Sequence, residues 1–110
     1  MPFTPDKKPQ EEEWYYFDFA PALAPGERLL AMNANEDVIE TMMTVKRGRF
    51  TDPAPEDMLD GAPVLLSDSL VAQKVIGGLE GVKYILHCKA PTDGDQILEE
   101  CDELRVSACD

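Results

Sequence analysis

The residues best suited to nucleophilic or metal chemistry are the single histidine, His87, and three cysteines, Cys88, Cys101 and Cys109. His87 and Cys88 are adjacent in a segment with the pattern of a β-strand, so their side chains point to opposite faces of the sheet. A nucleophile and its base must lie within hydrogen-bonding distance, and these two therefore cannot form such a pair. No Cys-x-x-Cys or other Cys/His spacing typical of a zinc site occurs.

The three cysteines do not form a disulfide framework. If the turn that follows residue 90 is centred near Asp93, Cys88 faces about Leu98 and is no neighbour of Cys101. We expect the cysteines to be buried or free thiols. The alternatives are a bond from Cys101 or Cys109 to another subunit, and metal binding.

The carboxylates are numerous but lack a catalytic or metal-binding spacing. They gather in residues 11–13 and 99–103, where carboxylates could lie close to each other. Solvated faces explain these clusters equally well. Asp93-Gly94-Asp95 lacks the spaced ligands and the terminal Glu of a calcium loop. No Gly-rich phosphate cradle and no catalytic triad pattern is present. We therefore expect no enzyme, with no catalytic residue, no metal site and no cofactor.

The net charge of −12, from 22 Asp and Glu against 10 Lys and Arg, limits the classes of partner. Binding to nucleic acid requires clustered Lys and Arg to neutralise phosphates, so nucleic acid is not expected as a partner. The same charge argues against anionic membrane surfaces. No apolar run approaches the ~20 residues of a membrane span, and no signal-peptide pattern opens the chain. We expect a protein that is made in the cytoplasm and stays in the cell until it is assembled or released.

The elements that position these residues are strands, and the clearest strand covers residues 82–90. Its apolar side chains share one face: Val82, Tyr84, Leu86, Cys88 and Ala90. Alternation of this kind predicts a strand with one buried face. Residues 70–76 predict another strand, closed by Gly77-Gly78, and the turn at 91–95 predicts a hairpin to residues 97–106. Three consecutive strands with short turns predict an antiparallel meander as the core of the fold.

The last of these segments, residues 97–106, also fits helical spacing, and Glu, Leu and Arg are good helix formers. A strand is preferred because Leu98 and Leu104 share one parity and a hairpin turn precedes them. Glu100 and Asp102 then fall on the buried parity, which predicts a bulge or an edge position.

Four further strands are predicted, over residues 13–19, 27–32, 38–45 and 64–67. About seven short strands with turn signals at intervals of roughly ten residues predict an all-β fold, an immunoglobulin-like antiparallel β-sandwich. The expected domain covers residues 14–107, with little helix beyond one turn near 56–59, and residues 108–110 form a C-terminal tail.

Residues 1–13 are rich in Pro and Glu and predict an extended arm, because their one large apolar side chain, Phe3, cannot order the segment by burial. An arm laid across a neighbouring subunit is favoured over an arm folded back on its own subunit. Both remain open.

Candidate partner contacts lie in the arm, in the first strand and in a basic segment. Trp14 and Tyr16 are predicted to face outward, which suits an interface, although partial burial under a loop accounts for them equally. Residues 46–49 predict an exposed basic turn that is either solvated or meets an acidic partner. The candidate contacts are Phe3, Pro5, Pro9, Trp14, Tyr16, Arg47 and Arg49.

Several short motifs resemble those of a known family. A Tyr-x-Phe-Asp-Phe strand at 15–19 precedes an Ala/Pro corner and the sequence Gly-Glu-Arg-Leu at 26–29. Later come Gly77-Gly78, a Tyr-x-x-x-Cys strand at 84–88 and a closing Leu-Arg-Val at 104–106. This pattern, over about half of the chain, resembles the small immunoglobulin-like virion proteins of tailed bacteriophages, of the fibre–tail adaptor and head–tail connector type.

The resemblance implies a non-enzymatic structural protein of the virion that joins neck or tail components or attaches fibres. Its expected partners are other virion proteins and copies of itself, without nucleic acid or membrane. The alternative from another class is a soluble acidic inhibitor or mimic that binds a basic host protein.

Overall fold

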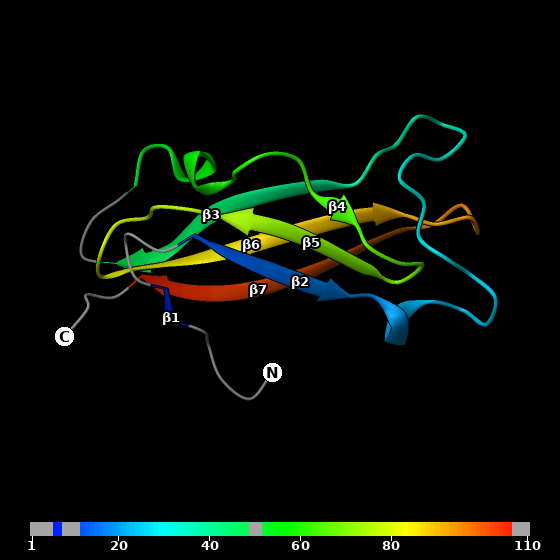
Figure 1. The fold of residues 1–110 in the computed structure, drawn as a ribbon, viewed down its shortest axis with the longest axis horizontal. Helices are drawn as coiled ribbons and strands as arrows, with labels where there is room; N and C mark the ends of the chain where they lie inside the picture. The colour runs from blue at the N-terminus through cyan, green and yellow to red at the C-terminus, as the bar shows by residue number, and fades with distance from the viewer. Residues whose placement is uncertain (1–5, 8–11, 49–51, 107–110) are drawn as a thin grey trace.

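The computed structural model describes residues 6–7, 12–48 and 52–106, which form an all-β fold (Figure 1). The strands are β1 (Asp6–Lys7), β2 (Glu13–Asp18), β3 (Glu40–Gly48), β4 (Val64–Leu65), β5 (Leu70–Val75), β6 (Val82–Pro91) and β7 (Ile97–Val106). Two short 3₁₀ turns, η1 (Ala20–Ala22) and η2 (Pro55–Met58), are the helical elements of the described residues. The predicted helical turn near residues 56–59 corresponds to η2.

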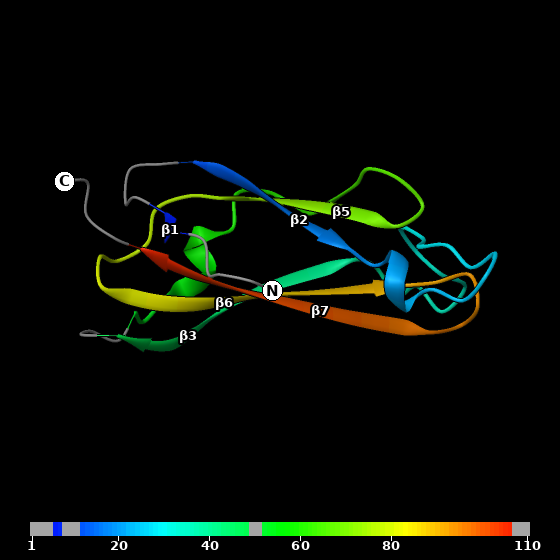
Figure 2. The same ribbon diagram turned by 90° about the horizontal axis from the view of Figure 1, so that it is seen from below.

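Two sheets form the layers of a sandwich, as Figure 2 shows from the side. One sheet has the strand order β1-β7-β6-β3 and the other β2-β5-β4. The orders β3-β6-β7 and β2-β5-β4 match the C-F-G and B-E-D strands of an immunoglobulin domain. The predicted immunoglobulin-like sandwich is therefore confirmed. A difference lies in β1, which pairs with β7 in parallel instead of adding to β2.

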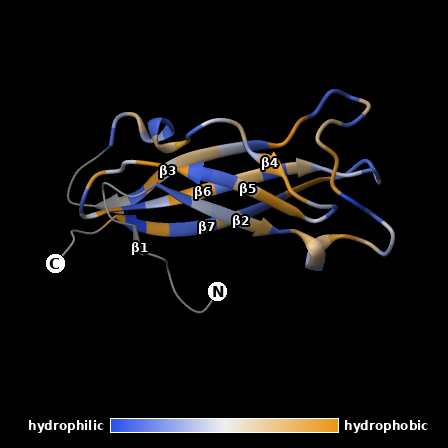
Figure 3. Ribbon diagram, viewed as in Figure 1, coloured by the Kyte–Doolittle hydropathy of each residue, from blue (hydrophilic) through white to orange (hydrophobic). Residues whose placement is uncertain are grey.

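The core lies between the layers and follows the predicted alternation, visible as alternating hydropathy along the strands in Figure 3. Tyr15, Phe17 and Phe19 face inward, as predicted. The inward face of β6 is also the predicted one. The central buried side chains include Phe19, Leu29, Met43, Val71, Val75, Val82, Tyr84, Leu86, Cys88, Leu104 and Val106.

The predicted meander of three strands is wrong, because β5 and β6 lie in different sheets. Both strands bury an apolar face, and the two faces can pack against each other only from opposite layers. Gly77, Gly78 and Gly81, all with positive φ, make the crossing between the sheets. At Gly78 a Cβ atom would lie 2.7 Å from Val106, so glycine is required there for space as well as for φ.

A buried tyrosine forms a hydrogen bond with the segment that crosses between the sheets. The Tyr84 hydroxyl donates to Asp52 Oδ2 at 2.8 Å and accepts from the backbone N–H of Leu79 at 2.9 Å. A tyrosine near the start of this strand that bonds back to the preceding corner is also typical of immunoglobulin domains. Burial raises the pKa of Tyr84 to about 12, so the hydroxyl keeps its proton at neutral pH.

The predicted strand at residues 27–32 is also wrong. Leu29 and Met32 form isolated bridges, and no strand is assigned to this segment. The backbone N–H of Leu29 donates to Asp68 in the turn between β4 and β5, and that of Leu30 donates to Pro91 at the end of β6. The segment thus passes from one sheet to the other across the end of the sandwich and extends neither.

The predicted basic turn at residues 46–49 is corrected in part. Lys46, Arg47 and Gly48 belong to β3, where a bulge between Val45 and Arg47 takes up the extra residue. Arg47 is paired with Lys83 of β6. Arg49 lies outside the described residues.

Part of the predicted arm pairs with its own domain. Asp6 and Lys7 form β1 and pair with Arg105 and Val106 of β7. For these two residues the alternative of an arm folded back on its own subunit holds. Residues 1–5 and 8–11 lie outside the described residues, and Phe3, Pro5 and Pro9 are among them.

The strand β7 is confirmed over its full predicted length, with a continuous register to β6 and no bulge. Within the described residues its outer edge pairs only with β1, at Arg105 and Val106, so Glu100 and Asp102 occupy the predicted edge. Inward-pointing charges on an edge strand oppose pairing with a further strand. Burial raises the pKa of Asp102 above its ordinary value.

One polar side chain connects the two layers. Gln73 of β5 is fully buried, and its Oε1 accepts from the Thr41 hydroxyl of β3 at 2.6 Å. Its Nε2 donates to the carbonyls of Gly61 and Lys74. Every polar atom of the carboxamide is thus hydrogen-bonded inside the core.

We predict that Gln73→Ala lowers the free energy of unfolding by about 1–3 kcal/mol, because the Thr41 hydroxyl and the Gly61 carbonyl lose a buried partner. Urea unfolding measures the change. Gln96→Ala, at an exposed position, is the matched control and should change stability by less than about 0.5 kcal/mol. Equal effects at the two positions would contradict the bridging role of Gln73.

We also predict that Asp102→Asn stabilises the protein at neutral pH. The pKa of Asp102 is raised in the folded state, so between the unfolded and the folded pKa the native protein binds more protons than the unfolded chain. Stability therefore decreases as the pH rises through the interval between these two pKa values. The gain from Asp102→Asn should disappear well below pH 4, where the carboxyl is protonated in both states. Glu80→Gln, at an exposed site, controls for the loss of one negative charge. A gain that is independent of pH would refute the burial effect.

Candidate docking surface

The clearest functional feature is a row of apolar side chains on the outer face of the three-stranded sheet. Trp14 and Tyr16 of β2 stand on one side, and Val64 of β4 and Leu66 beyond it stand on the other. Ala72 of β5 forms the floor between them, and the five residues line a shallow groove of about 160 Å³. We call these five residues the apolar strip.

The strand register explains this shape. Ala72 is the cross-strand partner of both Tyr16 and Val64, so two large side chains flank a methyl group. Although Ala72 points outward it is 2% exposed, because its neighbours cover it. The four large side chains remain accessible, with exposed fractions of 48% for Trp14, 55% for Tyr16, 42% for Val64 and 52% for Leu66. A contiguous apolar surface of this kind is typical of a protein interaction site.

Carboxylates border the apolar strip. At one end Lys74, the partner of Trp14, forms ion pairs with Glu12 at 3.1 Å and Asp60 at 3.5 Å. Hydrogen bonding and charge from Glu12, then Asp60, raise the pKa of Lys74. At the other end lies Asp18, the partner of Leu70. Among the described residues, three carboxylates and one ammonium group lie at this border, which leaves it negative.

The structure brings some of the predicted contacts together and separates others. Trp14 and Tyr16 face outward, as predicted, and form one wall of the apolar strip. Arg47 lies in the other sheet, away from this strip. Val64 and Leu66 were missed as contact residues. The signal was the apolar run Val64-Leu65-Leu66, because a strand with three successive apolar residues must turn at least one of them outward.

The opposite face of the sandwich holds a contact that the sequence did not predict. Cys101 Sγ lies 3.3 Å from His87 Nδ1, and Thr44 Oγ1 lies 3.0 Å from His87 Nε2. His87 and Cys88 do point to opposite faces, as predicted, but His87 pairs with Cys101 across the β6–β7 hairpin. Cys88 faces Glu100 and not Leu98, because the turn is centred on Gly94 and not on Asp93.

The electrostatic surroundings of this pair oppose nucleophilic chemistry. Burial and the carboxylates of Glu99, Glu100 and Asp102 raise the pKa of Cys101, so its thiol keeps its proton. A nucleophilic cysteine requires the reverse shift. The thiol S–H can then donate to His87 Nδ1, which leaves the Nε2–H to donate to Thr44.

In residues 6–7, 12–48 and 52–106, no group of three or more His, Cys, Asp or Glu side chains is placed to hold a metal ion. In the same part of the chain no helix is long and apolar enough to cross a membrane.

We predict that the thiols differ sharply in reactivity. Burial, Glu100 and Cys101 raise the pKa of Cys88 to about 12, and Cys88 is fully buried, while Cys101 is exposed. In a Cys109→Ser variant, titration with a thiol reagent at pH 8 should modify one thiol, Cys101, in the native protein and a second after unfolding. Adding Cys101→Ser should remove the native reaction. A rapidly reacting Cys88 would contradict the packing of β6.

Comparisons with protein-family models, with curated proteins and with solved structures found no match for this chain. The geometry of the apolar strip therefore carries the functional assignment.

Proposed function

We propose that this chain is a non-enzymatic structural protein of a tailed-bacteriophage virion, which joins neck or tail components or attaches fibres by docking through the apolar strip. The observation that carries the proposal is the strip itself. Trp14 and Tyr16 belong to the residue types that dominate binding energy at protein interfaces. The resemblance of the sequence motifs to small virion proteins supplies the setting.

The scaffold suits this role. Trp14, Tyr16, Val64 and Ala72 lie on strands of a sheet whose inner face packs on the core, so the strip is held in shape before a partner arrives. Surfaces that need little reorganisation bind with a smaller entropic cost. The partner we propose for the strip is another virion protein, and further copies of the chain are proposed as neighbours in the particle.

A soluble acidic inhibitor of a basic host protein is the second candidate, and the net charge of −12 favours it. Such an inhibitor could use the same strip. The two functions differ in assembly: a virion component stays in the particle at fixed stoichiometry, and an inhibitor does not.

The test is copurification of the chain with virus particles, followed by variants of the strip. We predict that Leu66→Glu reduces incorporation at least about ten-fold, because it introduces a charge into one wall of the docking surface. Ile97→Glu is the matched control, since Ile97 is 54% exposed but lies outside the strip. It should be incorporated normally, and circular dichroism should show both variants folded.

Absence of the chain from purified particles would refute the virion assignment. Equal incorporation of the two variants would refute the docking role of the apolar strip.

A further inference from the structure

We infer that the docking partner presents one large apolar side chain flanked by Lys or Arg residues, which enters the groove over Ala72 while its cations meet Glu12, Asp60 and Asp18. This inference deepens the proposed function and depends on it. It names the chemistry of the partner at this strip.

The size of the groove argues for a single anchor. Its volume is about 160 Å³, with Tyr16 and Val64 as walls and Ala72 as floor. An apolar cavity of about 150 Å³ is large enough to take up benzene. One leucine, methionine or phenylalanine side chain therefore fills the groove, and a second has no place at its floor.

The charges at the two ends argue for a basic segment. Of the residues that the structure describes, Lys74 is the cation at the border, and its ammonium group already contacts both Glu12 and Asp60. Asp18 stands at the other end with its Oδ1 accepting from the backbone N–H of Ala20. A cation that approaches either end meets excess negative charge, and an anion meets repulsion. Complementary charge of this kind selects partners and raises association rates.

The same charges argue against a second copy of the chain as the occupant. Each copy carries a net charge of −12, so two strips placed face to face would bring two acidic borders together. Like charges at an interface are costly unless paired with cations. We therefore assign the groove to a basic, apolar segment of another protein.

The structure supplies its own reporter for a test. Trp14 is the only tryptophan of the chain and forms a wall of the groove, where it is 48% exposed. A bound side chain should exclude water from the indole of Trp14 and shift its fluorescence emission to shorter wavelength. The probes are short synthetic peptides without tryptophan: one with a central Leu flanked by Lys, one with the same Leu flanked by Glu, and one with a central Ala flanked by Lys.

With the full chain, the Leu peptide flanked by Lys should shift the Trp14 emission saturably at up to millimolar concentration, and the other two should not. The shift should weaken as salt is added, because the charges are solvent-exposed. Leu66→Glu should abolish the shift, and Ile97→Glu should leave it intact.

Substitutions of the charged residues at the border should change the affinity for the Lys peptide in opposite directions. Lys74→Gln removes the cation between two carboxylates and should tighten binding of the Lys peptide about two- to five-fold. The double variant Glu12→Gln/Asp60→Asn leaves Lys74 without these partners and should weaken binding by a similar factor. A role of these residues in folding alone would not move affinity in opposite directions.

Binding of the Glu peptide as tight as that of the Lys peptide would overturn the inference, as would no shift with any peptide. An emission shift that grows with protein concentration alone would assign the groove to a second copy and would also overturn it. Each of these results is compatible with incorporation of the chain into particles. Loss of copurification would instead refute the proposed function.

Discussion

The buried carboxamide of Gln73 is the interaction on which the arrangement of the two sheets and of the outer groove depends. Its bond to Thr41 fixes β5 against β3 of the opposite layer, inside a core whose other buried side chains are mostly apolar. Its bond to the Gly61 carbonyl holds the segment that leads into β4. That segment places Val64 beside Ala72. A polar group inside the core thereby sets the shape of an apolar surface outside it.

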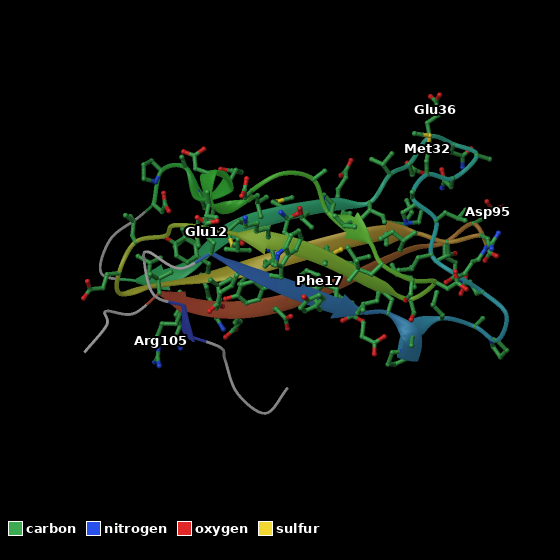
Figure 4. All side chains as sticks on the ribbon, viewed as in Figure 1. Glu12, Phe17, Met32, Glu36, Asp95 and Arg105 are labelled. Carbon is green, nitrogen blue, oxygen red and sulfur yellow. The ribbon has the colours of Figure 1, made fainter. Side chains whose placement is uncertain are left out.

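The carboxylates of the chain act differently at two places, the edge strand β7 and the border of the apolar strip. Glu12 lies at the start of β2 and Arg105 near the end of β7, whereas Glu36 and Asp95 lie at the opposite end of the molecule (Figure 4). In β7 the carboxylates Glu99, Glu100, Asp102 and Glu103 belong to a strand whose outer edge pairs, within the described part of the chain, only with β1. Such an edge resists the addition of foreign strands. The apolar strip, by contrast, is bordered by carboxylates but not covered by them, so the chain discourages non-specific pairing and leaves one surface open.

Much of this arrangement could be predicted from the sequence, because strand parity depends on local alternation. The inward set Tyr15, Phe17 and Phe19 and the outward pair Trp14 and Tyr16 follow from period two alone. The change of sheet after β5 could not be predicted, since alternation looks the same whether the next strand pairs in the same layer or faces it across the core. The segment around Leu29 has the composition of a strand, but backbone bonds to Asp68 and Pro91 decide its path.

In the candidate site, a small error in the predicted strand register leads to a larger error in the predicted contacts. Placing the centre of the β6–β7 turn one residue too early moved the partner of Cys88 by two residues and hid the contact between His87 and Cys101. Likewise, Trp14 and Tyr16 could be assigned from their own strand. Recognising Val64 and Leu66 as the second wall requires knowing that β4 and β2 both flank β5, which is information held by three segments far apart in the chain.

The parallel pairing of β1 with β7 has a mechanical consequence. The chain enters the domain through β1 and leaves through β7, and the two strands run in the same direction. Tension that pulls the two ends of the chain apart therefore acts along these strands. It loads the backbone hydrogen bonds between β1 and β7 together, in shear, and does not open them one after another. A fold connected in this way meets force applied at its ends first at the β1–β7 pairing and not at the face of the β2-β5-β4 sheet.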